Sequence, residues 1–384
     1  MNRHLEILAF FARLGGTAFG GPAAHVAMME DEFVRRRQWL TRERFLDLFG
    51  TANLLPGPTS TELALLLGRE RGGFLGLLLA GAGFILPAFI CVVAIAVFMA
   101  SGGQTPAFSS ALRGMQPVIV AIVAHAVTVL ARTAFKSPFL ICCALVAGTI
   151  GFFRPDFILL ILLGTGVLST LARTILPPKK SAGALALFVS LLSGKRACAE
   201  QALAAAATAA PLMVIGIWQM FWYFLKIGAV FYGSGYVIYS FLHDAFVARH
   251  LITEQQLANA ITVGQITPGP FFTSGAFVGY QLHGVAGAVL ATVGMFGPAF
   301  VYAIFCGPLI TRVRKAYWAR AFLDGVNAAS CALMLVVCWQ LGRGAMIDWK
   351  TIALFVVSLG ILVRFKINSA WLVLGGAAIG WAAL

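Results

Sequence analysis

The sequence predicts an all-α polytopic membrane protein built from two homologous repeats of inverted topology, each with a broken, re-entrant helix. Three observations predict this fold class. The 384 residues are 60% hydrophobic and only 11% charged, whereas a soluble domain is about 45–50% apolar and about 25% charged. Apolar runs recur to the end of the chain, and each bilayer crossing needs roughly 20 apolar residues. Matching motifs also recur in the two halves.

The charge balance fits a membrane protein. The chain has 28 Lys and Arg residues against 14 Asp and Glu residues, a formal net charge of +14. We expect no nucleic acid partner, because the sequence lacks a continuous basic face with interleaved aromatic residues. The basic residues lie in short loops between apolar runs, which is typical of loops on the cytoplasmic side of a bilayer. These features predict a multi-pass protein of a bacterial cytoplasmic (inner) membrane, with the lipid bilayer as a partner.

The apolar runs fall into two groups separated by a polar segment. They lie at 5–29, 45–67, 74–100, 115–135, 138–153 and 156–172, and then at 203–243, 257–281, 285–310, 325–342, 349–364 and 368–384. The intervening segment contains Pro177-Pro178-Lys179-Lys180 and Lys195-Arg196. We therefore predict a first repeat at 1–176, a cytoplasmic linker at 177–202 and a second repeat at 203–384.

The two halves align along most of their length. The matching pairs are Phe11 to Gly15 with Phe224 to Gly228, Asp31 to Val34 with Asp244 to Val247, Pro56-Gly57-Pro58 with Pro268-Gly269-Pro270, and Pro87-Ala88-Phe89 with Pro298-Ala299-Phe300. The register drifts by only a residue or two between these motifs. The chain therefore contains two copies of one unit, as many transporters do.

Equivalent loops of the two copies have opposite basicity. The loop 35–44 carries five arginines, whereas its equivalent at 247–256 carries only Arg249. The next loop, near 101–113, offers only Arg113, and its equivalent at 311–320 carries four basic residues. Under the positive-inside rule, equivalent loops of opposite basicity lie on opposite sides of the membrane. The copies should therefore be inverted relative to each other.

Each copy has a helix break inside an apolar run. Pro56-Gly57-Pro58 lies in the middle of the run 45–67, and two prolines around a glycine remove amide donors and break a helix. Each half-helix of about ten residues is then roughly 15 Å long, too short to span. Freed backbone is tolerated only against protein or a water-filled cavity, so we expect a re-entrant pair near the membrane midplane. Pro268-Gly269-Pro270 repeats this break.

The residues after each break predict an anion site. Thr59 and Ser60 follow the first break, and Thr273 and Ser274 follow the second. Proline followed by hydroxyl residues is typical of a helix N-terminus, whose exposed amides carry about half a positive charge. Two such N-termini pointing at each other would bind a small oxyanion. The alternative is a proline kink needed only for packing, which a duplicated motif disfavours.

Two aligned cations are candidates for the remaining positive charge. Arg13 and Lys226 occupy matching positions in the first apolar run of each copy. A cation in hydrocarbon is costly, so each should face a cavity, pair with a carboxylate or extend to the interface. The repetition favours a role in binding. Gly20, Gly21 and Gly233 would loosen the same helices and expose backbone amides to the site.

One acidic and two amide side chains complete the candidate site. Glu62 follows the first break, and the second copy has Ser274 in its place. A buried carboxylate there can accept a proton during transport, pair with Arg13, or serve only as a charge at a helix start; these alternatives stay open. Asn53 and Gln265 precede the breaks and can donate amide hydrogen bonds to a ligand or to neighbouring helices.

Several other polar residues are assigned structural roles. The charged segment 30–37 is interpreted as a solvated cytoplasmic face, with a gate ion pair at Asp31 or Asp244 as the minor alternative. His25 and His125 have no second ligand at helical spacing, so we expect core residues rather than metal ligands. The 7 cysteines form no CxxC pair, and we expect neither disulfides nor a metal cluster. The sequence predicts no cofactor.

The chain resembles a two-domain member of the chromate ion transporter family. The resemblance rests on Phe19-Gly20-Gly21-Pro22, on Asp31 to Val34 followed by Arg36 and Trp39-Leu40, on Leu55 to Glu62, and on Thr267 to Pro270. It covers both halves. It implies export of chromate, a tetrahedral dianion shaped like sulfate, from the bacterial cytoplasm, and hence chromate resistance. Sulfate or another small anion is the alternative substrate. The oligomeric state is open, with a homodimer as one option.

Rival functions are weaker. An intramembrane hydrolase using Ser60 or Ser274 would be the enzymatic alternative, but the sequence has no GxSxG motif. A chromate reductase would need a flavin or nicotinamide fingerprint, and none is present. A cation transporter would need intramembrane acids, which are scarce. The sequence therefore predicts a transporter and not an enzyme.

Overall fold

The fold is built from helices. The computed structural model describes residues 2–18, 21–102, 105–153, 157–174, 213–231, 237–305, 317–365 and 369–383. Within them lie α1 (Arg3–Thr17), α2 (Gly21–Glu30), α3 (Arg42–Ala52), α4 (Thr59–Ala100), α5 (Pro106–Ala134), α6 (Pro138–Phe153), α7 (Ile158–Thr174), α10 (Ile217–Val230), α11 (Ile238–Leu242), α12 (Glu254–Ile266), α13 (Ser274–Phe305), α15 (Tyr317–Ala345), α16 (Trp349–Arg364) and α17 (Ser369–Ala383). The predicted linker 177–202 lies outside the described residues.

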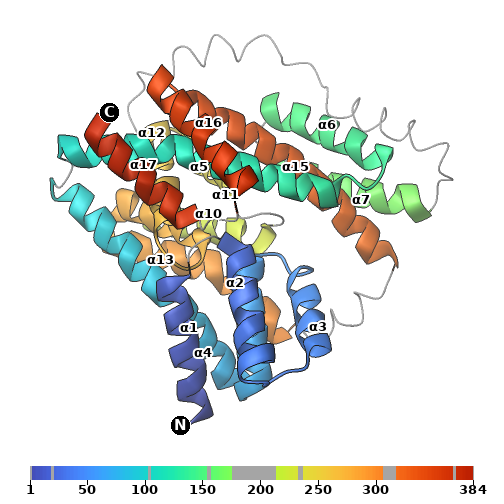
Figure 1. Ribbon diagram of the computed structural model, residues 1–384. Coiled ribbons are helices and arrows are strands. Elements are labelled where there is room, and N and C mark those ends of the chain that lie inside the picture. The colour runs from blue at the N-terminus through green and yellow to red at the C-terminus, as the bar shows by residue number, and fades with distance from the viewer. Residues whose placement is uncertain are drawn as a thin grey trace.

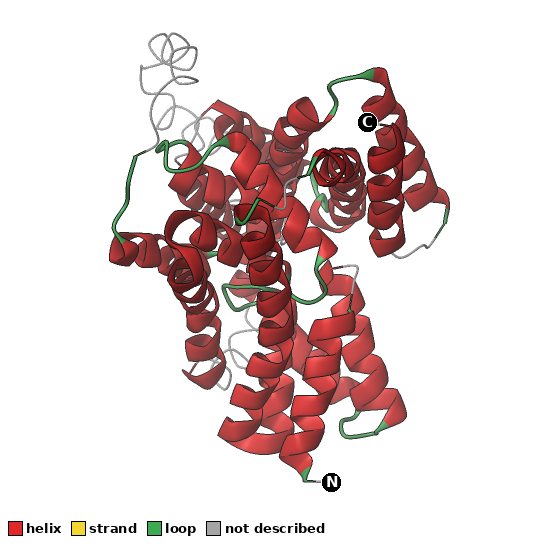
Figure 2. Cartoon of the chain, turned by 90° about the vertical axis from the view of Figure 1, so that its left-hand side faces the viewer, coloured by secondary structure: helices red, strands yellow, loops and turns green. Residues whose placement is uncertain are grey.

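The helices form two regions, and α12 contacts helices of both. In Figure 1, α1 to α4 lie together in the lower part, and α5, α6, α7, α15, α16 and α17 lie across the upper part. Helix α5 packs against α15, α16 and α17, and α15 packs against α6 and α7. Helices α4 and α13 pack against each other. Figure 2 shows the two ends of the chain far apart, with helices filling the space between them.

The surface fits a lipid environment. Four helical stretches of the described residues are long and apolar enough to cross a membrane: Thr59–Ala100, Pro106–Arg132, Phe271–Phe305 and Trp318–Ala345. Large apolar side chains point outward along them, including Leu86, Ile90, Val293 and Val301, each about half exposed. A soluble monomer rarely exposes such extensive apolar surface. The predicted all-α, multi-pass membrane protein is confirmed to this extent.

Helix α4 is a hairpin of two legs. Its backbone leaves helical geometry at Gly72 and at Gly73, where φ is +63°. A Cβ atom added at Gly68 would overlap the carbonyl oxygen of Gly76. Residues eight apart on a straight helix are about 12 Å apart, so the chain must reverse between them. Helix α13 repeats this at His283 and Gly284, where Gly279 lies against Gly287.

Helix α3 and the first leg of α4 form a second antiparallel pair. Arg44, in the first turn of α3, donates two hydrogen bonds of 2.9 Å to the carboxylate of Glu70, at the end of that leg. The break at 53–58 joins their other ends. Helix α3 has 11 residues and is therefore about 16 Å long, roughly half of a bilayer core. Both predicted helix breaks are present, because α12 likewise ends at Ile266 before the second motif.

Local irregularities recur in both copies. A π-helical turn occupies Asp31–Arg36 in the first copy and His243–Val247 in the second. Gln38 and His250 both have positive φ, at 51° and 56°. Thr41 and Thr253 then cap the following helices through their side chains. Such matching of strained positions extends the repetition seen in the sequence to the backbone.

One predicted boundary is wrong. The sequence assigns residues 101–113 to a loop, but α5 begins at Pro106 and contains Arg113. Thr105 accepts a hydrogen bond from the amide of Phe108, and proline at the first helical position needs no acceptor. This cap starts the helix well before the apolar run begins.

Candidate functional site

The two breaks are bonded across the halves in a reciprocal way. The amide of Gly57 donates to the carbonyl of Phe231, at 2.7 Å, and the amide of Gly269 donates to the carbonyl of Ala18, at 3.0 Å. Ala18 and Phe231 are the C-cap residues of α1 and α10, the first helices of the two copies. Each break therefore satisfies the end of the first helix of the other copy.

Glycine is required at both breaks. Gly57 has a φ of +138° and Gly269 a φ of +93°, in regions that L-residues rarely adopt. A Cβ atom at Gly269 would lie 2.8 Å from the carbonyl oxygen of Gly15 and 2.9 Å from the Cβ of Ala88. The first break in turn lies against Ala299, the residue equivalent to Ala88. The backbone thus approaches the other copy more closely than a side chain allows.

Phe231 brings the two breaks close together. Its carbonyl oxygen accepts from Gly57, as above. Its ring centroid lies 4.6 Å from that of Phe272, edge to face, and Phe272 is the second residue after the second break. The sequence predicts that the two breaks meet near each other. In the structure, both breaks have Phe231 as a neighbour.

The hydroxyl residues after the breaks are buried. Ser60 is 3% exposed, Thr273 1% and Ser274 0%, while Thr59 is half-buried. Thr273 Oγ1 donates to the carbonyl of Pro270 and Ser274 Oγ to that of Phe271. These two hydroxyls are therefore used within the second break, and each must rotate to donate to a ligand.

Glu62 is enclosed beside the first break. Its side chain is fully buried, and neither carboxyl oxygen has a hydrogen-bond partner among the described residues. A Cβ atom at Gly57 would lie 2.6 Å from Oε1, so the carboxyl group reaches back to the break. Thr61 Oγ1 is also buried without a partner among the described residues. The sequence does not single out Thr61, because threonine is common in membrane helices.

The amide residues before the breaks differ in their surroundings. Asn53 is exposed, and its Nδ2 donates to the carbonyl of Phe49 at 3.0 Å. Gln265 is half-buried, with Nε2 buried and unpartnered among the described residues. Helix α12 packs against α5, whereas α3 lies at the edge of the molecule in Figure 1. Only Gln265 therefore has an enclosed donor at its break.

The two cations have different surroundings: Arg13 pairs with a carboxylate, and Lys226 lines a cavity. Arg13 Nη2 contacts Glu32 Oε2 at 3.4 Å, and its side chain is 57% exposed. Arg13 thus pairs with Glu32 and not with Glu62, one of the alternatives left open by the sequence. Lys226 is exposed and lines a cavity of about 330 Å³ together with Asp244 and Arg249. For either cation to contact an anion at the breaks, its side chain must move.

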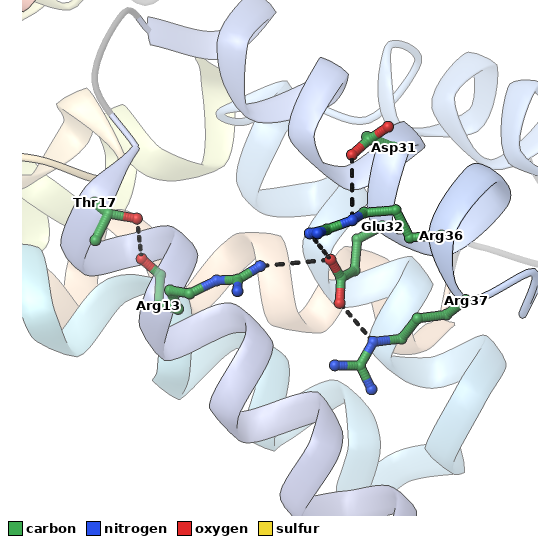
Figure 3. A network of polar contacts seen from close by, with 6 residues as sticks. All are labelled: Arg13, Thr17, Asp31, Glu32, Arg36 and Arg37. Carbon is green, nitrogen blue, oxygen red and sulfur yellow. Dashed lines mark hydrogen bonds and ion pairs between the residues drawn. The ribbon is translucent and has the colours of Figure 1, made fainter.

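Figure 3 shows a network centred on Glu32. Glu32 is 5% exposed and accepts from Arg37 Nε at 2.5 Å and from Arg13 and Arg36 at 3.4 Å. Arg36 also contacts Asp31 at 3.9 Å. The interpretation of segment 30–37 as a solvated face is therefore wrong at Glu32. Glu32 lies in the π-helical turn Asp31–Arg36, with its carboxylate directed inward. The sequence pattern does not predict a π-helical turn, so it does not predict the burial of Glu32.

The glycines near the ends of the first helices are described only in part. Helix α1 ends at Thr17 and α2 begins at Gly21, so the helix is interrupted where predicted. Gly20 and Gly233 lie outside the described residues. His25 is 1% exposed, its Nε2 lies 3.3 Å from the carbonyl of Ala18, and its ring packs against Phe84, consistent with the predicted core role.

A polar cavity lies on the face of α12 that leads to Gln265. It measures about 450 Å³ and is lined by Gln116, Tyr239, Glu254, Gln255, Thr262, Gln340 and Arg343 among others. Burial favours a higher pKa for Glu254, but the hydrogen bonds from His243 and Tyr239 outweigh it and hold that pKa below its usual value. Thr262 and Gln265, three residues apart, lie on one face of the helix. The sequence alone does not reveal this cavity, because its residues come from four separate helices, α5, α11, α12 and α15.

Comparisons with known proteins place the chain in a family. The family profile described as "Chromate transporter" matches twice, over residues 5–215 and 218–381. A chromate transport protein of Cupriavidus metallidurans is 29% identical over 97% of this chain and 91% of its own length. A chromate transport protein of Pseudomonas aeruginosa is 28% identical over 98% of this chain and 91% of its own length. No solved structure matches the chain. The resemblance stated from the motifs is confirmed, and the chain belongs to the chromate transporter family.

Proposed function

We propose that this protein exports chromate across the bacterial cytoplasmic membrane and thereby confers chromate resistance. The observation that carries the proposal is the duplicated helix break, with each glycine amide bonded to the other half, in a chain of the chromate transporter family. An inside-negative potential of about 100 mV favours export by roughly 2.3 kcal/mol for each negative charge that leaves the cell. Export of a dianion is therefore feasible without another driving ion.

The proposed binding site lies between the two breaks. The first amides after Pro58 have no acceptor within the helix, and we assign the segment after Pro270 to the other side of the site. Amides at Thr59 and Ser60, and the hydroxyls of Thr273 and Ser274 after rotation, would replace part of the hydration of the oxyanion. Gln265, with its buried free donor, and Asn53 complete the polar set.

Dipoles alone do not replace the hydration of a dianion. At least one full positive charge is needed, and we assign it to Arg13 or Lys226. Both side chains are exposed, so both can change direction, although Arg13 must then give up its ion pair with the buried Glu32. The ion pair of Arg13 with Glu32, at 3.4 Å, is long enough to be exchanged for an anion.

We further propose that the copies are inverted in the membrane, with the two breaks as re-entrant segments near the midplane. Arg69, beside the turn of α4, donates to the carbonyl oxygens of Ala303 and Ile304 at 2.6 and 2.7 Å. These carbonyls lie at the end of α13 farthest from its own turn at Gly284. The turns of the two hairpins thus lie at opposite ends of the pair, in agreement with the opposite basicity of equivalent loops.

The experiment is uptake of radiolabelled chromate into inverted membrane vesicles, with and without a membrane potential. We expect uptake that depends on the protein, that increases with the potential, and that falls when Arg13→Gln and Lys226→Gln are combined. Vesicles from cells lacking the protein are the control. Equal uptake in both kinds of vesicle would refute the proposal. Uptake of sulfate with no uptake of chromate would show the alternative substrate.

A further inference from the structure

The side chain of Glu62 has no evident structural purpose. It lies in the first turn of α4, fully buried, with both carboxyl oxygens unpartnered among the described residues. Structural carboxylates at helix starts are usually solvated or hydrogen-bonded to amides. Resting on the export function proposed above, we propose that Glu62 is the proton-binding residue of the transport cycle and must be protonated before the site closes around an oxyanion.

The burial of Glu62 requires a neutral carboxyl group. An ionised carboxylate removed from water is stabilised only by a paired charge or by several hydrogen bonds. Glu62 has neither among the described residues. Its Oε1 reaches back to the backbone of Gly57, and Gly57 in turn lies against the methyl group of Ala299. The group therefore ionises only when the break opens to water.

The charged and titratable groups on the packed elements are directed elsewhere. Helix α4 packs against α1, α2, α3, α12 and α13. On α1, Arg13 pairs with Glu32, and Glu6 pairs with Arg71. On α2 and α3, His25 contacts the carbonyl of Ala18, Glu30 pairs with Arg42, and Arg44 pairs with Glu70. On α12 and α13, Glu254 accepts hydrogen bonds from Tyr239 and His243, and Tyr302 donates to the carbonyl of Ala229. Glu62 accepts no hydrogen bond from the remaining titratable groups on these helices either, which are Arg3 and His4 on α1, Glu43 and Asp47 on α3, and Tyr280 and His283 on α13.

A bound dianion is a second reason for the carboxyl group of Glu62 to be neutral. Glu62 is three residues beyond Thr59, in the same first turn whose amides would hold the anion. A carboxylate there would repel a second negative charge in a site closed to water, where screening is weak. The anion and the neutral carboxyl group are therefore compatible, and the anion and the carboxylate are not. Closure of the loaded site then depends on one proton.

Because the second copy has no acid at the equivalent position, the pH dependence of transport should follow a single titrating group. Ser274 occupies the position of Glu62 at the second break and does not titrate near neutral pH. The pH dependence should thus follow one proton, with a tenfold fall in rate for each pH unit above the pKa of Glu62. Two titrating groups would give a steeper fall.

The test compares chromate uptake by the wild type and by Glu62→Gln in inverted vesicles across a range of pH on the loading side. Chromate itself takes up a proton near neutral pH, which affects both proteins equally. The measured quantity is therefore the uptake rate of the wild type divided by that of Glu62→Gln at each pH. We expect this ratio to fall tenfold per pH unit at high pH, because glutamine mimics the neutral acid. The matched control is Glu43→Gln, which removes an exposed carboxylate from α3 and should keep the wild-type profile.

A binding measurement keeps the test independent of transport rates. Chromate should raise the thermal unfolding midpoint of the purified wild type only at low pH, and that of Glu62→Gln at every pH. A constant ratio of uptake rates, together with equal chromate stabilisation at every pH, would overturn the role of Glu62 while leaving chromate transport intact. Absence of chromate uptake in the wild type at any pH would instead refute the export function itself.

Discussion

At the scale of single residues, Glu32 joins three arginines that otherwise repel one another. Arg13, Arg36 and Arg37 come from two elements, and Glu32 is the acceptor for all of them. We expect Glu32→Gln to lower the free energy of unfolding by about 1–3 kcal/mol, because charge-assisted hydrogen bonds are lost at a buried position. A lower midpoint of thermal unfolding in detergent checks this.

Asp31 is the matched control for Glu32. It lies one residue earlier, is half exposed and contacts only Arg36, at 3.9 Å. Exposed ion pairs contribute about 0.2–1 kcal/mol, so Asp31→Asn should change the midpoint little. Equal losses in the two variants would contradict the central role given to Glu32.

The glycines of the breaks should not tolerate a side chain. Gly57→Ala and Gly269→Ala each place a methyl group in a backbone region that alanine avoids, and against Glu62 or Gly15. We expect each to abolish chromate uptake and lower the amount of folded protein. Gly360→Ala on α16, where a Cβ atom meets nothing within 4 Å, should leave both unchanged. Uptake at the wild-type rate in Gly57→Ala would count against the site.

The residue types at the site follow from the sequence, whereas their contacts do not. The helix break can be predicted from Pro56, Gly57 and Pro58 alone, because proline removes amide donors and interrupts a helix. The pairing of Arg13 with Glu32 depends on a π-helical turn and on the packing of α1 against it. Such a long-range contact leaves no periodic trace in the sequence. The full burial of Glu62 beside Gly57 likewise depends on how the chain folds at the break.

At the scale of elements, the first helix of each copy depends on a glycine contact with the following hairpin. A Cβ atom at Gly15 would overlap the carbonyl of Phe84, and one at Gly228 would overlap that of Met295. Overpacking of this kind costs about 1–3 kcal/mol. We expect Gly15→Ala and Gly228→Ala to lower the thermal midpoint by similar amounts, since the two contacts are equivalent.

Gly16 provides the control on the same helix. A Cβ atom there would lie 3.8 Å from Pro87 Cβ, an ordinary van der Waals contact, so Gly16→Ala should be tolerated. A larger loss for Gly16→Ala than for Gly15→Ala would show that α1 does not pack as described.

The hairpins illustrate which elements the sequence can predict. The apolar runs 45–67 and 74–100 already leave a gap at Gly72-Gly73, where α4 turns back. That the two legs lie side by side depends on Gly68 meeting Gly76. In sequence, these glycines look the same as the glycines that only separate bulky side chains.

At the scale of the whole molecule, the proposed inverted arrangement predicts on which side of the membrane each loop lies. Gln38 and His250 are equivalent positions with the same unusual backbone. In a background without the 7 native cysteines, we expect cysteine at Gln38 to react from the cytoplasmic side and cysteine at His250 from the opposite side. Membrane-impermeant thiol labelling of cells and inverted vesicles measures this.

Labelling at a third position, Tyr317, adds a second comparison between the two copies. Cysteine at Tyr317, next to the basic segment of the second copy, should react from the same side as cysteine at Gln38. Labelling of Gln38 and Tyr317 from opposite faces would contradict the inverted arrangement, and so would labelling of Gln38 and His250 from the same face.

The reciprocal hydrogen bonds between the breaks and the first helices have an evolutionary consequence. They join Gly57 to Phe231 and Gly269 to Ala18 through main-chain atoms only, so no substitution at Phe231 or Ala18 removes the acceptor. Mutational drift in one half needs no compensating change in the other at these joints. The side chains around them are therefore free to specialise after duplication, as Glu62 and Ser274 have done. A pair of once identical half-sites can acquire two different chemistries while the joint that holds them together is inherited unchanged.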